Sequence, residues 1–202
     1  AACMQVAPPR RSNRERTEAT RAALIAAARA LFVEKSYAET GTPEIAAAAG
    51  VTRGALYHHF ADKQALFTAV VEAEAQAVAA EIDAATAAPL STKQALLSGM
   101  DAFFAAMAVP GRTRLLLLDG PAVLGHKTLD EIDQRHGGRT LREGLAAAIE
   151  AGEMCPLPTD ALATQLSAMS DRAALAIEAG ASAEDHRTVI AAVIESLFIS
   201  RT

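Results

Sequence analysis

The chain has 202 residues, a formal net charge of −5 at pH 7 and 51% hydrophobic residues, yet only 4% aromatic residues and no tryptophan. This alanine-rich composition favours close-packed helices and disfavours sheet. The two cysteines form neither a metal-ligand pattern nor a disulfide framework, and no uncharged run is long enough to cross a membrane. We therefore expect an all-α cytoplasmic protein without membrane association, cofactor or bound metal. The segment 1–9 also lacks the basic start and apolar core of a signal peptide.

The charge is divided unevenly along the chain. Residues 1–60 contain eight Lys or Arg against five Asp or Glu, a surplus of +3, whereas residues 61–202 contain eleven against nineteen, a balance of −8. A basic N-terminal part suits phosphate binding, and an acidic remainder would repel DNA and orient the protein on it.

Four arginines precede the first helix, which we expect over residues 17–35: Arg10, Arg11, Arg14 and Arg16. We interpret residues 1–16 as a disordered basic arm. Two roles stay open for it, a purely solubilising one and a contact with the minor groove or the flanking phosphates.

Two short helices are predicted next, separated by a tight turn. Thr42, Pro43 and Glu44 predict a helix start, because a Thr hydroxyl can cap free N–H groups, Pro suits the first turn and an early acid suits the positive helix end. Gly50 ends this helix in a left-handed conformation, and Thr52 caps the next one.

The second short helix carries polar side chains on one face. Leu56 and Phe60 are spaced to face inward, whereas Arg53, Gly54, Tyr57 and His58 face outward. Two helices joined by a tight glycine-containing turn, the second with base-reading chemistry, describe a helix-turn-helix. An ordinary helical hairpin with a solvated face is the alternative. Gly54 favours DNA reading, since glycine there costs about 1 kcal/mol relative to Ala and admits a close partner.

These residues carry a family resemblance. The stretch 17–74 resembles the N-terminal domain of TetR-type transcriptional regulators, most specifically in GVTRGALYHHFADKQALF at 50–67 and also in LFVEKSY at 31–37. The resemblance covers about the first third of the chain. Pro43 stands where many members carry a polar or basic residue, which removes one base contact, and Ser36 stands where Gly is more usual.

The resemblance also implies roles for individual residues. Thr42 and Thr52 would bind phosphates at helix N-termini, and Arg53 and Gly54 would lie against base edges. The residues implied to bind the DNA backbone are Tyr57, His58 and Lys63.

The rest of the chain predicts further helices, about nine in all. A long helix capped by Asp62 and running to about 88 should join a helix-turn-helix domain (17–64) to an effector-binding and dimerisation domain (65–202). The later helices are expected over 91–109, 112–119, 126–151 with a possible break at 137–138, 159–179 and 182–200. Gly120-Pro121 should end the helix over 112–119 and separate it from the helix over 126–151.

The last two helices have wide apolar surfaces. Their apolar residues are Leu162, Leu166, Met169, Ala173, Leu175 and Ile177, then Val189, Ile190, Val193, Ile194, Leu197 and Phe198. Pairing with a second copy in a four-helix bundle would bury this surface, similar to the way TetR-type proteins dimerise. Packing on the core of the same subunit is the alternative. A twofold homodimer would present two recognition helices to a pseudo-palindromic operator.

A central cluster is the candidate wall of an effector pocket. Its residues are Met100, Phe103, Phe104, Met107, Leu117 and His126. An ordinary core is the alternative, because Met and Phe at helical spacing serve packing equally well. The resemblance implies an effector cavity among these helices, and the side chains suggest a mostly apolar small molecule.

Nothing in the sequence indicates an enzyme. It has no Gly-rich phosphate loop, no nucleophile elbow and no Cys/His pair. His126 and Asp130, with Asp133 and His136 beyond, could bind a metal, but a solvated face is the alternative. We predict a repressor that a small-molecule effector releases from a palindromic DNA operator. A helical scaffold, or a small-molecule binder without DNA function, is the alternative.

Overall fold

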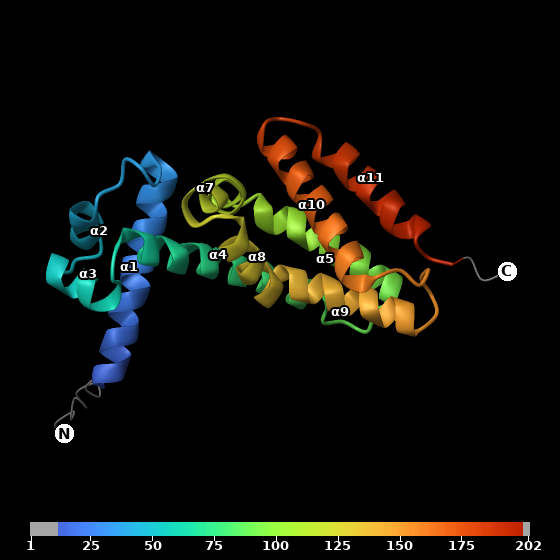
Figure 1. Ribbon diagram of the computed structural model, residues 1–202, viewed down its shortest axis with the longest axis horizontal. Helices are drawn as coiled ribbons and strands as arrows, with labels where there is room; N and C mark the ends of the chain where they lie inside the picture. Colours follow the sequence, from blue (N-terminus) through green and yellow to red (C-terminus); the bar gives the residue numbers. More distant parts are fainter. Residues whose placement is uncertain (1–11, 200–202) are drawn as a thin grey trace, which may run out of the picture. The chain divides into compact units, whose positions relative to one another are not determined.

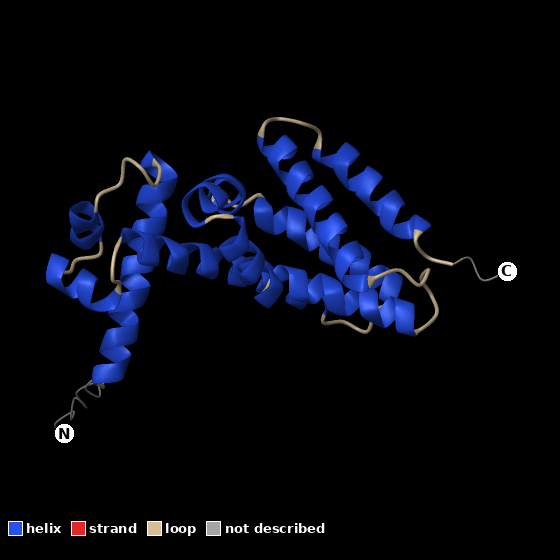
Figure 2. Ribbon diagram, in the orientation of Figure 1, coloured by secondary structure: helices blue, strands red, loops and turns tan. Residues whose placement is uncertain are grey.

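The computed structural model describes residues 12–199, and its regular elements in that range are helices apart from one isolated bridge between Met154 and Phe198 (Figures 1 and 2). The predicted all-α class is confirmed. The chain divides into two compact units, residues 1–70 and residues 71–202. Within the described range, no helix combines the length and the apolar character that crossing a bilayer requires.

The first unit contains three helices and the start of a fourth: α1 (Asn13–Lys35), α2 (Thr42–Ala48), α3 (Arg53–His59) and α4 (Lys63–Thr86). Each helix contributes a fully buried apolar side chain to one core, including Phe32 from α1, Ile45 from α2, Leu56 from α3 and Phe67 from α4. Apolar burial of this kind supplies about 1.5–3 kcal/mol for each large side chain. The four helices therefore form one packed head.

The first helix begins earlier than expected. Ser12 caps α1, and its hydroxyl accepts a hydrogen bond from the Glu15 amide while the Glu15 carboxylate accepts one from the Ser12 amide. Arg14 and Arg16 are therefore helical and do not belong to an extended arm. Arg10 and Arg11 lie outside the described residues.

The second unit comprises the rest of α4 and the following elements: α5 (Thr92–Met107), α6 (Arg112–Arg114), the π-helical turn η1 (Leu115–Asp119), α7 (Gly120–Leu124), α8 (His126–Arg135), α9 (Gly137–Glu150), α10 (Thr159–Glu178) and α11 (Ala183–Ser196). Helix α5 packs against α9 and α11, and α10 runs beside α9 and α11 (Figure 1). Their inner faces share a core that includes Leu96, Phe104, Leu145, Leu166 and Ile190.

The prediction that the helix ends at Gly120-Pro121 was wrong, because residues 112–124 form one continuous helical run. The Gly120 amide donates to the carbonyl of Leu115, five residues back, and this widened turn accommodates Pro121, which has no amide of its own. A Cβ on Gly120 would stand 2.9 Å from that Leu115 oxygen, so a side chain there would collide with the turn. The predicted break near 137–138 is confirmed, since α8 ends at Arg135 and α9 begins at Gly137.

Candidate nucleic-acid interface and effector cavity

The start of α2 differs from the sequence-based expectation. Gly41 is the N-cap residue, and the Gly41 amide donates a hydrogen bond to the Glu44 carboxylate at 2.6 Å. Thr42 therefore does not cap α2. Its hydroxyl lies 3.1 Å from the hydroxyl of Tyr57 on α3. The second carboxylate oxygen of Glu44 accepts from the ammonium of Lys35 at 2.6 Å, which fixes the end of α1 to the start of α2.

The turn between α2 and α3 follows the prediction. Gly50 adopts φ +68°, and the Val51 amide donates to the carbonyl of Ala46 at 3.0 Å. Thr52 is the N-cap of α3, and its hydroxyl accepts from the Ala55 amide at 3.1 Å. This turn holds α3 at a defined angle to α2, as a helix-turn-helix requires.

The outer face of α3 is accessible and polar. Arg53, Gly54, Tyr57 and His58 are all exposed, and the Arg53 guanidinium lies 5.5 Å from the centre of the Tyr57 ring. A Cβ built on Gly54 would meet only the Thr52 hydroxyl oxygen, at 3.9 Å. Packing inside the protein therefore does not require glycine at this position.

The Tyr57 phenol is tuned by its neighbours. The hydrogen bond with Thr42, and then the charged guanidinium of Arg53, hold the pKa of Tyr57 below its usual value. Both interactions stabilise negative charge on the phenol oxygen and so make the phenol a stronger hydrogen-bond donor. The side chain is 42% exposed, so its hydroxyl group remains within reach of a partner.

Lys63 has a structural role that the sequence did not reveal. Its ammonium group donates to the carbonyls of Tyr37 at 2.9 Å and Thr40 at 3.1 Å, and it lies 4.2 Å from the centre of the Tyr37 ring. It thereby joins the start of α4 to the loop after α1. An ammonium has three N–H groups, so a contact of Lys63 with the DNA backbone through the third stays a prediction.

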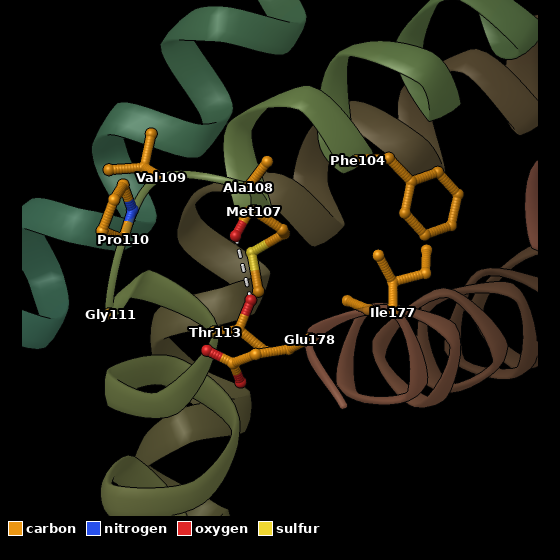
Figure 3. Close-up of a pocket in the computed structure, with 10 residues that line it drawn as sticks. Phe104, Met107, Ala108, Val109, Pro110, Gly111, Thr113, Ile177 and Glu178 are labelled. Carbon is orange, nitrogen blue, oxygen red and sulfur yellow. Dashed lines mark hydrogen bonds between the residues drawn. The ribbon is translucent and has the colours of Figure 1, made fainter. Parts of the chain in front are cut away.

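A cavity of about 260 Å³ lies in the second unit, between the end of α5, the loop into α6 and the last turns of α10 (Figure 3). It is lined by Phe104, Met107, Ala108, Val109, Pro110, Gly111, Thr113, Ala174, Ile177 and Glu178. The Thr113 hydroxyl donates to the Met107 carbonyl at 3.0 Å, so its proton is already engaged.

Only Phe104 and Met107 of the six predicted pocket residues line this cavity. Met100, Phe103 and Leu117 pack against the hydrophobic core, and His126 is exposed at the start of α8. The reason is that α5 ends at Met107, so the cavity forms beyond its last turn and not along its length. The wall contributed by α10 could not be foreseen, because no local pattern indicates which distant helix covers the end of α5.

The residues considered for a metal site make other contacts. The His136 Nε2 atom lies 2.5 Å from Glu72 on α4, and the Asp133 carboxylate accepts from the Gly138 amide at 3.2 Å. Within residues 12–199, no three His, Cys, Asp or Glu side chains are grouped to hold a metal ion.

Residues 24–70 match the model of bacterial regulatory proteins of the tetR family, and residues 93–200 match the tetracyclin repressor-like C-terminal domain. Among curated proteins, the chain is 34% identical over 95 residues to the HTH-type transcriptional activator FasR of Mycolicibacterium smegmatis, covering 47% of this chain and 43% of FasR. It is 44% identical over 62 residues to the HTH-type transcriptional repressor BepR of Brucella suis, covering 31% of this chain and 29% of BepR. The matches thus span less than half of these relatives.

Among solved structures, a TetR-family transcriptional regulator from Pectobacterium atrosepticum superposes with a TM-score of 0.73 at 29% identity, covering 95% of this chain and all of that one. The first family model thus covers the helix-turn-helix, and the second covers most of the second unit. The second match alone spans more than half of the chain. The chain belongs to the tetR family of bacterial regulatory proteins.

Proposed function

We propose that this protein is a transcriptional repressor that binds a palindromic DNA operator as a homodimer and leaves it when a small molecule occupies the second unit. The observation that carries the proposal is the accessible face of α3, where Arg53, Tyr57 and His58 surround a glycine that internal packing does not require. Family membership supports the same function.

The roles on DNA follow from side-chain chemistry. Arg53, beside Gly54, would donate to a base edge in the major groove, where an arginine reads guanine with two hydrogen bonds. Thr42, Thr52, Tyr57 and His58 would contact phosphates and fix the register, as would Lys63 through its remaining N–H. In this proposal residues 17–64 bind DNA, and residues 65–202 bind the effector and dimerise.

Operator binding can be tested directly. Sites selected from a random duplex pool by the 202-residue protein would be titrated by fluorescence anisotropy over a salt series. We expect a palindromic consensus, affinity that falls steeply with salt, and a loss of about 1–3 kcal/mol with relaxed specificity in Arg53→Ala. Lys127→Ala, which removes an exposed cation from α8, away from the proposed dimer helices, is the control and should leave operator affinity unchanged. Weak, equal affinity for every sequence would refute operator recognition and favour a binder without DNA function.

The sign of regulation needs its own measurement, because FasR is named an activator and BepR a repressor. In vitro transcription from a promoter that overlaps the selected site should fall when the protein is added. A rise in transcript would refute repression while leaving DNA binding intact.

Dimerisation is proposed through α10 and α11. Part of their apolar surface serves the subunit's own core, since Leu166, Ile190 and Ile194 are buried. On α11, however, Val189 is 59% exposed and Val193, one helical turn later, is 36% exposed. A second copy would remove this patch from water.

The double variant Val189→Glu/Val193→Glu should convert the dimer to a monomer in light scattering coupled to size exclusion. Thr188→Glu, an exposed neighbour on the same helix, is the control and should remain dimeric. A dimer that persists in the double variant would place the interface elsewhere.

The route from effector to DNA starts at the cavity wall. Val109, Pro110 and Gly111 line the cavity, and the next residue, Arg112, is bound to α4 through Glu74 at 3.0 Å and Glu81 at 2.9 Å. Helix α4 begins in the DNA-binding unit. A ligand that moves the 109–111 loop would therefore shift the preferred position of α4 and with it the population of the DNA-competent state. By linkage, effector and operator must weaken each other's binding by the same factor.

A further inference from the structure

The cavity of the second unit has one charged residue in its lining. Of its ten lining residues nine are uncharged, and the exception is Glu178. Among residues 12–199, no Lys, Arg or His lines it. Arg112 is turned toward Glu74 and Glu81 on α4, and Arg114 is paired with Asp119 at 3.2 Å. The cavity therefore combines an apolar wall with a single negative charge.

Glu178 is exposed to solvent at the mouth of the cavity. It is the last residue of α10, where the free carbonyl groups and the helix dipole place partial negative charge. Within residues 12–199, its carboxylate takes part in no hydrogen bond or ion pair. Figure 3 shows the side chain reaching from α10 toward Thr113 on the opposite wall. The carboxylate is thus available to a ligand at the cavity.

The same face of α10 carries a second carboxyl group. Asp171 precedes Glu178 by two helical turns, and Ala174, which lines the cavity, lies between them. Burial, and then the charge of Asp133, raise the pKa of Asp171 to about 7. Asp171 itself does not line the cavity, so Glu178 is the carboxylate that a ligand there would contact.

The apolar wall limits the rest of the ligand. A volume of about 260 Å³ is at the small end for a ligand site, which favours one ring or a short branched chain. Phe104 and Ile177 supply an aromatic and an aliphatic surface for it. The Arg187 guanidinium lies 5.9 Å from the centre of the Phe104 ring but does not line the cavity.

We infer that the effector cavity takes a small organic cation, an amine or ammonium group on an apolar body, and that Glu178 is the charge partner that selects it. This inference rests on the proposed effector function of the same cavity and names the chemical class of its ligand.

Three probes that share a phenyl ring on a short chain test the inference on the 202-residue protein: 2-phenylethylamine, the neutral 2-phenylethanol and the anionic 3-phenylpropionate. Isothermal titration calorimetry at pH 7.5 should show the amine binding about ten-fold more tightly than the alcohol, as expected for a charge-assisted hydrogen bond, and the anion binding least. Glu178→Gln should remove the preference for the amine and leave the affinity for the alcohol unchanged. Glu184→Gln, an exposed glutamate on α11, is the control and should keep the preference.

Equal or tighter binding of the alcohol or the anion would overturn the inference, and so would a preference that survives Glu178→Gln. Failure of all three probes to bind at millimolar concentration would also overturn it. Operator affinity is measured separately by anisotropy, so loss of the cation preference in a protein that still binds its operator would refute the ligand class alone. Cation binding by a protein without operator affinity would refute the regulator proposal alone.

Discussion

The guanidinium Nε of Arg112 donates to the carboxylate of Glu74 at 3.0 Å, and both side chains are more than nine-tenths buried. The same guanidinium also donates to Glu81 at 2.9 Å and to the Ala106 carbonyl at 2.7 Å. The charge of Arg112 is thus compensated twice, and its N–H groups are directed to α4 and to the end of α5.

Removing Arg112 should be strongly destabilising. Arg112→Ala leaves Glu74 charged and buried, which costs about 3–5 kcal/mol in comparable pairs. Urea unfolding followed by circular dichroism, at fixed protein concentration, measures the free energy change. The double variant Arg112→Met/Glu74→Leu replaces the pair with apolar groups and should recover most of that loss. Glu81→Gln should cost less than about 1 kcal/mol, because Glu81 is 45% exposed. A full-sized loss in the double variant would show that the pair is not the cause.

Replacing Ser36 with glycine should stabilise the folded protein. It is the only non-glycine residue with positive φ among residues 12–199, at φ 87°. A non-glycine residue in this backbone conformation is strained by about 1–3 kcal/mol. Relief of that strain outweighs the stability that is lost because glycine gives the unfolded chain more conformational entropy. Ser36→Gly should therefore raise the free energy of unfolding by about 1 kcal/mol. Ser36→Ala keeps the strain and tests whether the hydroxyl matters. A less stable glycine variant would contradict the conformational argument.

Gly54→Ala should separate stability from function. The added methyl group meets only the Thr52 hydroxyl oxygen at 3.9 Å, and alanine favours a helix by about 1 kcal/mol over glycine. The variant should therefore unfold at a higher urea concentration. Its affinity for the selected operator should nevertheless fall at least ten-fold, because the methyl group would stand between α3 and the base edges. Unchanged operator affinity would mean that DNA does not approach α3 at this residue.

Asp171 should make the protein less stable as the pH rises from about 4 to 7. Its pKa is raised to about 7 from an ordinary value of 3.8. In this window the folded state keeps the proton and the unfolded state has lost it, so stability falls by up to about 1.4 kcal/mol per pH unit. Above pH 7 the loss is complete.

Asp171→Asn should remove this slope, and thermal unfolding between pH 5 and 8 measures it. Below this range, protonation of Glu44 and Glu72 would also reduce stability and oppose the effect of Asp171. Lys35 lowers the pKa of Glu44, and Arg135 together with His136 lowers the pKa of Glu72. Identical pH profiles for the wild-type and variant proteins would mean that Asp171 titrates normally.

The recognition unit could be predicted from the sequence because its determinants are local. Gly50 and Thr52 specify a turn through their own backbone and hydroxyl group, and the four-residue spacing of Leu56 and Phe60 specifies which face of α3 is buried. The positions of Arg53 and Tyr57 on the opposite face then follow from helical geometry.

The sequence determined the class of fold, the recognition helix and the separation of a basic head from an acidic remainder, because helix propensity, turn chemistry and charge are properties of short segments. Tertiary structure decided which residues share a cavity and which charges are paired. Arg112 and Glu74 are 38 positions apart, and Phe104 and Glu178 are still further separated along the chain. Such pairs meet only through the packing of whole helices, which depends on side-chain volumes throughout the core and not on any local pattern.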